Sequence, residues 1–298
     1  MLGTPERAEE IIRECPEWFH SIELAPGVFT PGRNSPESFA GLLDGLRLPD
    51  LHGKSVLDIG AYDGYFSFAA ERLGASRVIA LDHYVWSADM VEYMKDWRAS
   101  FKNNVVPPAP SETRHWRPAE LPGRRPFDAA HAILDSRVEP VVGDFMTMDL
   151  THLGRFDVVL FLGVLYHLED PLRAMRRLAE VTAPAGLAVI ATHAMELPGV
   201  DAPFFAFYPG AELNNDASNW WGPNANALVG LCRAAGFQDV VLVTEPPRPP
   251  FGTRLRLALS TSKNLVLESL PKLLGFRPEV KGALHPVHYY AIAHARLP

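Results

Sequence analysis

One stretch decides the fold: Ser55-Val56-Leu57-Asp58-Ile59-Gly60-Ala61-Tyr62-Asp63-Gly64-Tyr65-Phe66-Ser67. Its apolar residues before the first glycine predict a short strand buried in a parallel sheet. Gly60 and Gly64 then bracket a tight turn, and apolar side chains recur at helical spacing until Gly74 ends the helix. This order of strand, turn and helix is typical of the opening unit of a nucleotide-binding α/β domain.

The glycine spacing indicates which nucleotide the turn accepts. A dinucleotide-binding turn has the pattern G-x-G-x-x-G, whereas three residues separate Gly60 from Gly64. Asp58, two residues before Gly60, offers a carboxylate to the ammonium group of a methionine moiety. These features favour S-adenosylmethionine (SAM), which has no phosphate, over a nicotinamide dinucleotide. A plain turn without a ligand is the alternative at this point.

Composition and charge narrow the classes of function. Hydrophobic residues make up 47% of the 298 residues, enough for a sizeable core, and the net charge of -7 argues against a broad nucleic-acid surface. The two cysteines, Cys15 and Cys232, have no metal-ligand spacing, and no apolar run is long enough to cross a bilayer. We therefore expect a cytoplasmic protein that binds no metal and no membrane.

Acidic residues follow two further predicted strands. Asp82 ends a strand predicted over 77–82, at a distance from Gly60 where an acid accepts hydrogen bonds from ribose hydroxyls. Asp144 follows a strand predicted over 138–142 and could read an adenine edge, with Phe145 stacked near the ring. Because ligands lie outside the carboxyl ends of strands in open α/β sheets, we expect these side chains to gather with Tyr166 at one edge.

Four more strands are predicted at 158–162, 187–191, 238–243 and 287–296, the last antiparallel beside the one before it. The predicted fold class is α/β, with a Rossmann-like seven-stranded sheet. A helical and aromatic cap is expected over 1–50 and a cofactor-binding domain over 51–298. Insertions at about 83–130, 194–224 and 245–286 exceed an ordinary crossover, and we expect the first to help build a substrate pocket.

A family resemblance rests on Val56–Gly64, Asp82, Asp144 and Phe156–His167, which are similar to the class I SAM-dependent methyltransferases. The segments 18–24 (WFHSIEL), 30–32 (TPG) and 163–167 (GVLYH) resemble a narrower branch. That branch includes the tRNA wobble-uridine carboxymethyltransferases and small-molecule methyltransferase-like proteins. The resemblance implies the seven-stranded class I methyltransferase sheet. It also implies a cofactor site lined by Asp58, Gly60, Ala61, Tyr62, Gly64, Asp82, His83, Asp144, Phe145, Leu162 and Tyr166.

The carboxymethyltransferases use carboxy-SAM, and Lys and Arg side chains hold its extra carboxylate. Around residues 33–40 this chain has Arg33 and Glu37 but no matching lysine. The long segment 83–130 also differs from those enzymes and points to a different acceptor. We therefore expect SAM rather than carboxy-SAM, although the basic residues of 245–286 could substitute for the missing lysine.

Three histidines are candidate general bases for methyl transfer. His193 is expected directly after the fifth strand, His167 lies after the fourth, and His20 in the cap could reach in. A structural role at a polar pocket wall is the alternative for each, and a phenol or carboxylate acceptor needs no base. The candidate substrate-binding residues are Trp18, Arg33, Trp86, Trp220 and Trp221.

The sequence thus predicts an enzyme that methylates an oxygen or nitrogen atom of a small metabolite, such as a natural-product or sugar-like acceptor. A tRNA wobble-uridine methyl- or carboxymethyltransferase and a non-catalytic SAM-binding protein are the alternatives. The sequence excludes neither tRNA as a partner nor a homo-oligomer.

Overall fold

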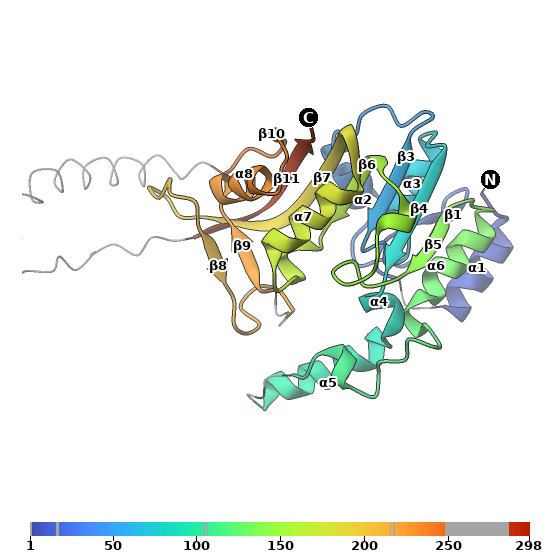
Figure 1. Cartoon of the computed structure of the whole chain (residues 1–298). Helices are drawn as coiled ribbons and strands as arrows, with labels where there is room; N and C mark the ends of the chain where they lie inside the picture. The colour runs from blue at the N-terminus through green and yellow to red at the C-terminus, as the bar shows by residue number, and fades with distance from the viewer. Residues whose placement is uncertain are drawn as a thin grey trace, which may run out of the picture.

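A seven-stranded sheet forms the middle layer of the computed structural model (Figure 1), in the order β10-β11-β7-β6-β3-β4-β5. β11 runs antiparallel to both of its neighbours, and the remaining pairs are parallel. This confirms the predicted Rossmann-like sheet and its antiparallel last strand. The strands are β3 (Ser55–Ile59), β4 (Arg77–Asp82), β5 (Glu139–Val142), β6 (Phe156–Leu162), β7 (Thr182–Glu196), β10 (Asp239–Leu242) and β11 (Val287–Arg296).

The order in which successive strands are added to the sheet reverses beside β3. From β3 the chain moves outward through β4 to β5, and it then returns to β6 on the other side of β3. Open α/β sheets bind ligands outside the carboxyl ends of the strands at such a reversal. The topology therefore places the candidate site at the carboxyl ends of β3 and β6.

The structure describes residues 2–15, 18–103, 105, 107–214, 216, 218–247 and 286–298, without the side chain of Phe101. Most of the insertion expected at 245–286 lies outside these residues. So do the basic side chains predicted there: Arg248, Arg254, Arg256, Lys263, Lys272, Arg277 and Lys281.

Helices cover both faces of the sheet. Alternation along β3 sends Val56 into one core and Leu57 into the other, as a strand buried on both faces requires. The core around Val56 includes residues of α1 (Pro5–Glu14), α2 (Pro36–Gly45), α3 (Tyr65–Arg72) and α6 (Arg125–Ile133). The core around Leu57 includes residues of α7 (Pro171–Val181) and α8 (Ala225–Ala234).

Polar caps begin four of these helices, and the cap of α8 is Asn224, whose side chain accepts a hydrogen bond from the Ala227 N–H. Thr4, Ser35 and Asp170 each accept a hydrogen bond from the backbone N–H three residues on, and a proline follows each cap. The pairs Ser35-Pro36 and Asp170-Pro171 in the sequence predict helix caps at these positions, and the structure confirms both.

Two predictions about the strands and loops were wrong. The fifth strand does not end before His193, because β11 pairs with β7 as far as Glu196 and keeps it extended. The aromatic and asparagine-rich sequence of residues 204–224 predicts a loop, but this segment contains a hairpin of β8 (Phe205–Phe207) and β9 (Trp221–Pro223). The segment 83–130 contains α4 (Tyr84–Ser87), α5 (Met90–Lys102) and the 3₁₀ turns η1 (Pro110–Glu112) and η2 (Pro122–Arg124). Two more such turns are η3 (Thr151–Leu153) and η4 (Leu165–His167).

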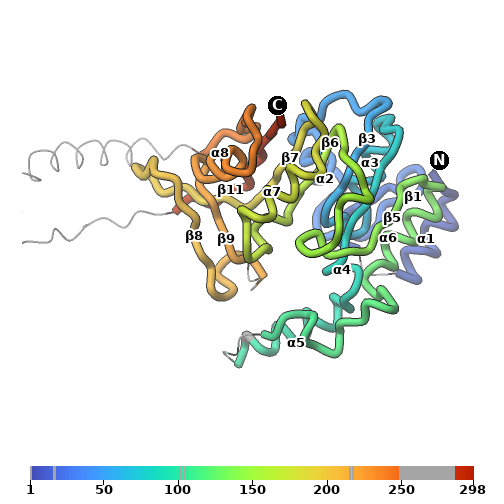
Figure 2. The backbone as a smooth tube through the Cα atoms, in the orientation of Figure 1, coloured from blue at the N-terminus to red at the C-terminus, as the bar shows by residue number. Residues whose placement is uncertain are grey.

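The N-terminal segment is built into the same core as the sheet, and α1 lies beside α6 (Figure 2). It contains the short pair β1 (Glu23–Ala25) and β2 (Val28–Phe29). Asp63, which is fully buried, accepts hydrogen bonds from the backbone N–H groups of Phe19 and His20, both at 2.8 Å. Its other oxygen pairs with Nδ1 of His20. One carboxylate thus joins this segment to the glycine turn. The boundary at residue 50 between a cap and a cofactor-binding domain remains a prediction from the sequence.

Asp63→Ala should lower the free energy of unfolding by about 3 kcal/mol, because two backbone N–H groups and a buried imidazole lose their acceptor. Urea denaturation at pH 7 measures this loss. Asp239→Ala, on the exposed edge strand β10, is the matched control and should change stability by less than about 0.5 kcal/mol. Equal stability of the Asp63→Ala and wild-type proteins would show that this carboxylate does not hold the segment.

Candidate active site

The turn after β3 has an unusual backbone conformation. Gly60, Tyr62 and Gly64 have φ values of +78°, +54° and +89°, in the left-handed region that favours glycine. A Cβ atom on Gly60 would lie 2.6 Å from Cγ2 of Val164, so only glycine fits there. The Gly60 N–H donates to the carbonyl of Leu81 at 2.8 Å, which ties the turn to the end of β4.

Asp82 is a buried carboxylate that holds the same turn. Its oxygens accept hydrogen bonds from the N–H groups of Tyr62 at 3.0 Å and Val85 at 3.1 Å. The indole N–H of Trp86 donates to the Tyr62 carbonyl at 2.6 Å. Burial raises the pKa of Asp82, and the backbone donors oppose this rise. Each carboxylate oxygen has a second lone pair, so Asp82 can still accept hydrogen bonds from a ligand.

Asp58 lies at the base of the turn and is 2% exposed. The Ser67 hydroxyl donates to its carboxylate at 2.6 Å. Burial raises the pKa of Asp58 to about 6, against the opposing effects of the Ser67 hydrogen bond and of His20. A cation brought close to this carboxylate would favour its ionised form.

Two tyrosine hydroxyls converge beside Gly163, where β6 ends. A Cβ atom on Gly163 would lie 3.3 Å from Oη of Tyr290 and 3.5 Å from Oη of Tyr166. Burial raises the pKa of Tyr166 to about 12 and raises that of Tyr290 well above its ordinary value. Both phenols are therefore neutral hydrogen-bonding groups at physiological pH. Tyr290 lies directly opposite His193 in the pairing of β11 with β7, so His193 belongs to the same edge.

His193 pairs with a second histidine. Its Nε2 lies 3.1 Å from Nδ1 of His288, and its ring centroid is 6.5 Å from that of Tyr208. Burial first, and then His288, lower the pKa of His193 to about 4. The imidazole is thus neutral at physiological pH. In the tautomer whose Nε2–H donates to His288, Nδ1 keeps a lone pair that can accept a proton.

The other two candidate bases are held by the protein. Nδ1 of His167 lies 2.9 Å from the carbonyl oxygen of Ser218 and 3.0 Å from its hydroxyl, and burial lowers the pKa of His167. His20 is 7% exposed, its Nδ1 pairs with Asp63, and its ring stacks on Tyr65 with a centroid separation of 5.4 Å. The expectation that His20 reaches into the site is therefore corrected, because the ring is locked in the core.

The predicted substrate-binding tryptophans divide into two groups. Trp18 and Trp86 are 6% and 0% exposed, so the structure places both indoles in the core instead of in a pocket. Trp220 and Trp221 lie at the start of β9. The Trp220 ring is parallel to that of Phe207 with centroids 6.2 Å apart, and it remains partly exposed.

The remaining predicted cofactor residues lie at or near the carboxyl ends of the strands. His83 begins α4, with its ring edge-on to Trp116 at 5.0 Å. Asp144 uses its carboxylate to cap the turn after it. The Phe145 ring is 6% exposed and packs on Phe161 at 5.6 Å, so it belongs to the core. Ala61 is buried in the turn and Leu162 is partly buried at the end of β6.

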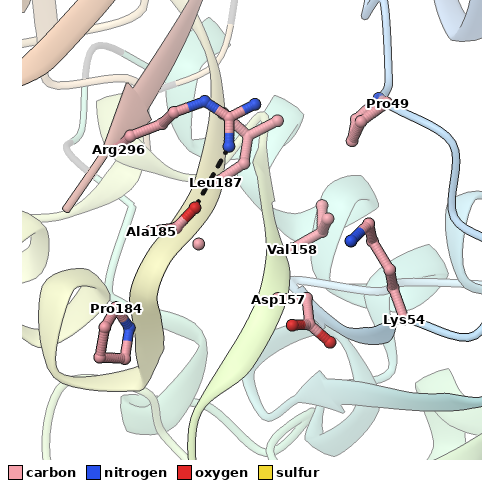
Figure 3. A pocket seen from close by; sticks show the side chains of 9 residues that line it. Pro49, Lys54, Asp157, Val158, Pro184, Ala185, Leu187 and Arg296 are labelled. Atoms are coloured by element: carbon pink, nitrogen blue, oxygen red, sulfur yellow. Dashed lines mark hydrogen bonds between the residues drawn. The ribbon is translucent and has the colours of Figure 1, made fainter. Parts of the chain in front are cut away.

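Two hollows lie near the ends of the strands, one on the side of the glycine turn and one on the opposite side. One, of about 440 Å³, is lined by Arg33 of the N-terminal segment, by Met94, Trp97 and Arg98 of α5, and by Asn214 and Asp216 before β9. The other, of about 330 Å³, opens at the amino ends of β3 and β6, where Lys54, Asp157 and Arg296 line it (Figure 3). The second hollow lies at the edge opposite the glycine turn, so it does not belong to the candidate site.

Sequence reasoning missed several residues of this edge. Asp63 lies within the stretch 55–67, but no local sequence pattern indicates that it pairs with His20. His288 and Tyr290 share a face of the last strand, yet only the strand register places them against His193. Across the described ranges, the structure shows no group of three histidine, cysteine, aspartate or glutamate side chains that could hold a metal ion, and no helix able to span a bilayer.

A family model described as a methyltransferase domain matches residues 33–242. The chain belongs to this methyltransferase family. Its sheet order and family match together make it a class I SAM-dependent methyltransferase.

The relatives of this methyltransferase are distant. The tRNA U34 carboxymethyltransferases of Campylobacter curvus (strain 525.92) and Idiomarina loihiensis are 22% and 25% identical over 194 and 197 residues. These matches cover 64% and 66% of this chain but 50% and 49% of the relatives. The chain thus spans about half the length of the curated relatives it matches.

Solved structures share its fold. The N-terminal domain of EvdMO1 with SAH bound has a TM-score of 0.53 at 16% identity, covering 98% of this chain and 95% of that one. Phosphoethanolamine N-methyltransferase 2 of Haemonchus contortus has a TM-score of 0.52 at 15% identity, covering 90% of this chain and 55% of that one. At these sequence identities, the likeness shows that the folds are similar and nothing more.

The affinity of the methyltransferase for SAM should rise about tenfold between pH 5 and pH 7. In the free protein the pKa of Asp58 is about 6, so its carboxylate is mostly protonated below that pH and offers no charge to an ammonium. Calorimetry of SAM binding across this range should show the rise in the wild-type protein and a flat profile in Asp58→Asn. Asp239→Asn is the control and should keep the wild-type slope. A wild-type profile that does not change across this range would contradict the role of Asp58.

Proposed function

We propose that this methyltransferase transfers the methyl group of SAM to an oxygen or nitrogen atom of a small-molecule acceptor. One observation carries the proposal: the glycine turn, two buried carboxylates and the His193 edge all lie at the same ends of the strands as a hollow of about 440 Å³. Hollows of this size are typical of small-molecule sites.

The residues at the turn suit SAM in charge and in shape. Asp82, with free lone pairs, would accept hydrogen bonds from the ribose hydroxyls, and Asp58 would face the methionine ammonium. Gly60 leaves room for a ligand to approach the backbone. When bound, SAM supplies a methyl carbon carried on a positively charged sulfur. The protein would align the acceptor with that carbon and exclude water, which is the largest part of catalysis in such a displacement.

His193 is the proposed general base for an acceptor that must lose a proton. Its free Nδ1 would take the proton from the acceptor O–H or N–H, while its Nε2–H stays hydrogen-bonded to His288. The neutral hydroxyls of Tyr166 and Tyr290 lie together at Gly163, and Tyr290 is the residue opposite His193 in the pairing of β11 with β7. An acceptor that is already an anion would need no base.

Methyl or carboxymethyl transfer to the wobble uridine of tRNA is the second candidate. The sequence similarity to tRNA U34 carboxymethyltransferases favours it. Against it stand the half-length coverage of those relatives and the net charge of -7.

Mass spectrometry of the small molecule released from the purified protein by denaturation tests the choice between these functions. SAM or SAH in the released fraction would support methyl transfer over carboxymethyl transfer and direct the search to small-molecule acceptors first. Carboxy-SAM would reverse the order of the two candidates and make tRNA the first acceptor to try. A protein that releases neither and does not bind added SAM would contradict both.

His193→Ala should lower turnover about 100-fold and leave the Kd for SAM within about twofold, because a base acts only on the acceptor. Turnover is measured as SAH formed with the acceptor that the wild-type protein uses. His152→Ala, an exposed histidine of η3, is the control. Because the pKa of His193 is about 4, the acid limb of wild-type kcat/KM due to this residue should lie near pH 4 and not near 6.5. Full turnover in His193→Ala would assign the proton to another group or show that no base is needed.

A further inference from the structure

We propose that the hollow between the N-terminal segment and α5 holds the acceptor by an anionic group, a carboxylate or a phosphate, bound to Arg33 and Arg98. The inference rests on the proposed function and adds the chemical class of its acceptor.

Three segments that lie outside the ordinary methyl-transfer sheet meet at this hollow. Arg33 comes from the N-terminal segment, Arg98 from α5, and Asp216 from the chain before β9. In Figure 1, α5 lies below α4, which follows the carboxyl end of β4, and the turn of the β8–β9 hairpin points toward the same side of the sheet. The hollow therefore opens at the edge where the cofactor turn lies.

Short chains of contacts connect the hollow to both walls of the proposed cofactor site. The Arg33 guanidinium lies 5.0 Å from the centroid of the Phe19 ring, and that ring is 4.6 Å from Tyr62 of the turn. On the other side, Asp216 accepts a hydrogen bond from the Ser218 hydroxyl at 2.6 Å, and Ser218 in turn holds His167. A molecule in this hollow would thus lie beside the turn and beside the end of β6.

The charges of the hollow favour an anion. Neither Arg33 nor Arg98 forms an ion pair with a carboxylate within the described residues, whereas nine ion pairs involve other arginines or lysines there. Asp216 already uses one carboxylate oxygen for the N–H and hydroxyl of Ser218, at 2.9 and 2.6 Å. Two guanidinium groups against one carboxylate leave an excess of positive charge. Guanidinium is the side-chain group that best matches carboxylate or phosphate oxygens, through paired N–H donors.

The remaining lining suits an organic acceptor better than a bare ion. Trp97 and Met94 give the hollow an apolar wall.

The second basic hollow provides an internal comparison. Its Arg296 donates to the Ala185 carbonyl at 3.3 Å (Figure 3). Its Asp157 accepts from the N–H and hydroxyl of Ser55, both at 2.8 Å. These polar groups already have protein partners, and they lie at the amino ends of the strands.

Binding of two simple anions to the SAH-loaded protein tests the proposal. Inorganic phosphate is titrated by phosphorus NMR and acetate by proton saturation-transfer NMR, with four variants beside the wild type. Arg98→Gln and Arg33→Gln alter the hollow, Arg72→Gln on the exposed face of α3 is the matched control, and Arg296→Gln alters the second hollow. We expect Arg98→Gln and Arg33→Gln each to weaken binding of the preferred anion at least tenfold, and the other two variants to bind it as the wild type does. The anion that binds more tightly identifies the acceptor group.

Unchanged anion affinity in Arg98→Gln, or a loss confined to Arg296→Gln, would overturn the proposal. Calorimetry with SAM and with carboxy-SAM separates the two sources of a carboxylate. If Arg33→Gln and Arg98→Gln weaken carboxy-SAM but not SAM, the anion belongs to the donor and the acceptor assignment is wrong. Failure of the proposed function is recognised separately, because the wild-type protein would then not bind SAM.

Discussion

The buried carboxylate of Asp63 is the interaction on which the site depends. A carboxylate with no exposed surface must be fully hydrogen-bonded, and Asp63 meets this need with the backbone of Phe19 and His20 and with the His20 ring. Because Asp63 stands in the middle of the glycine turn, the N-terminal segment and the turn are fixed to each other. This fixes the Phe19 ring against Tyr62 and brings Arg33 over Phe19.

A second set of contacts secures the turn from the other side. The left-handed backbone of Tyr62 is held by Asp82 through its N–H and by Trp86 through its carbonyl. Trp86 belongs to the long segment 83–130, so this segment is joined directly to the proposed cofactor loop. The same segment includes α5, whose Arg98 lines the hollow. Cofactor and acceptor sites are thus built from one connected set of contacts, which is how a site is kept preorganised.

Local signals in the sequence predicted the parts of the structure that local rules govern. A short apolar run, the glycine spacing and apolar residues at helical spacing predicted β3, its turn and the helix after it, and Ser35 with Pro36 predicted the start of α2. The position of His193 inside β7 could not be predicted, because the length of that strand depends on pairing with β11, about a hundred residues later. The burial of His20 depends likewise on a partner 43 residues away. The hollow at Arg98 escaped prediction because its walls come from three distant segments.

A crystal structure of the protein with SAH tests the central claim most directly. The account predicts that the ribose hydroxyls lie within about 3 Å of the Asp82 carboxylate and that the methionine ammonium faces Asp58. It also predicts that the sulfur lies on the side of Tyr166 and His193, with the hollow at Arg98 open beside it. SAH bound elsewhere, or bound at the turn with Asp82 making no contact to the ribose, would contradict the account.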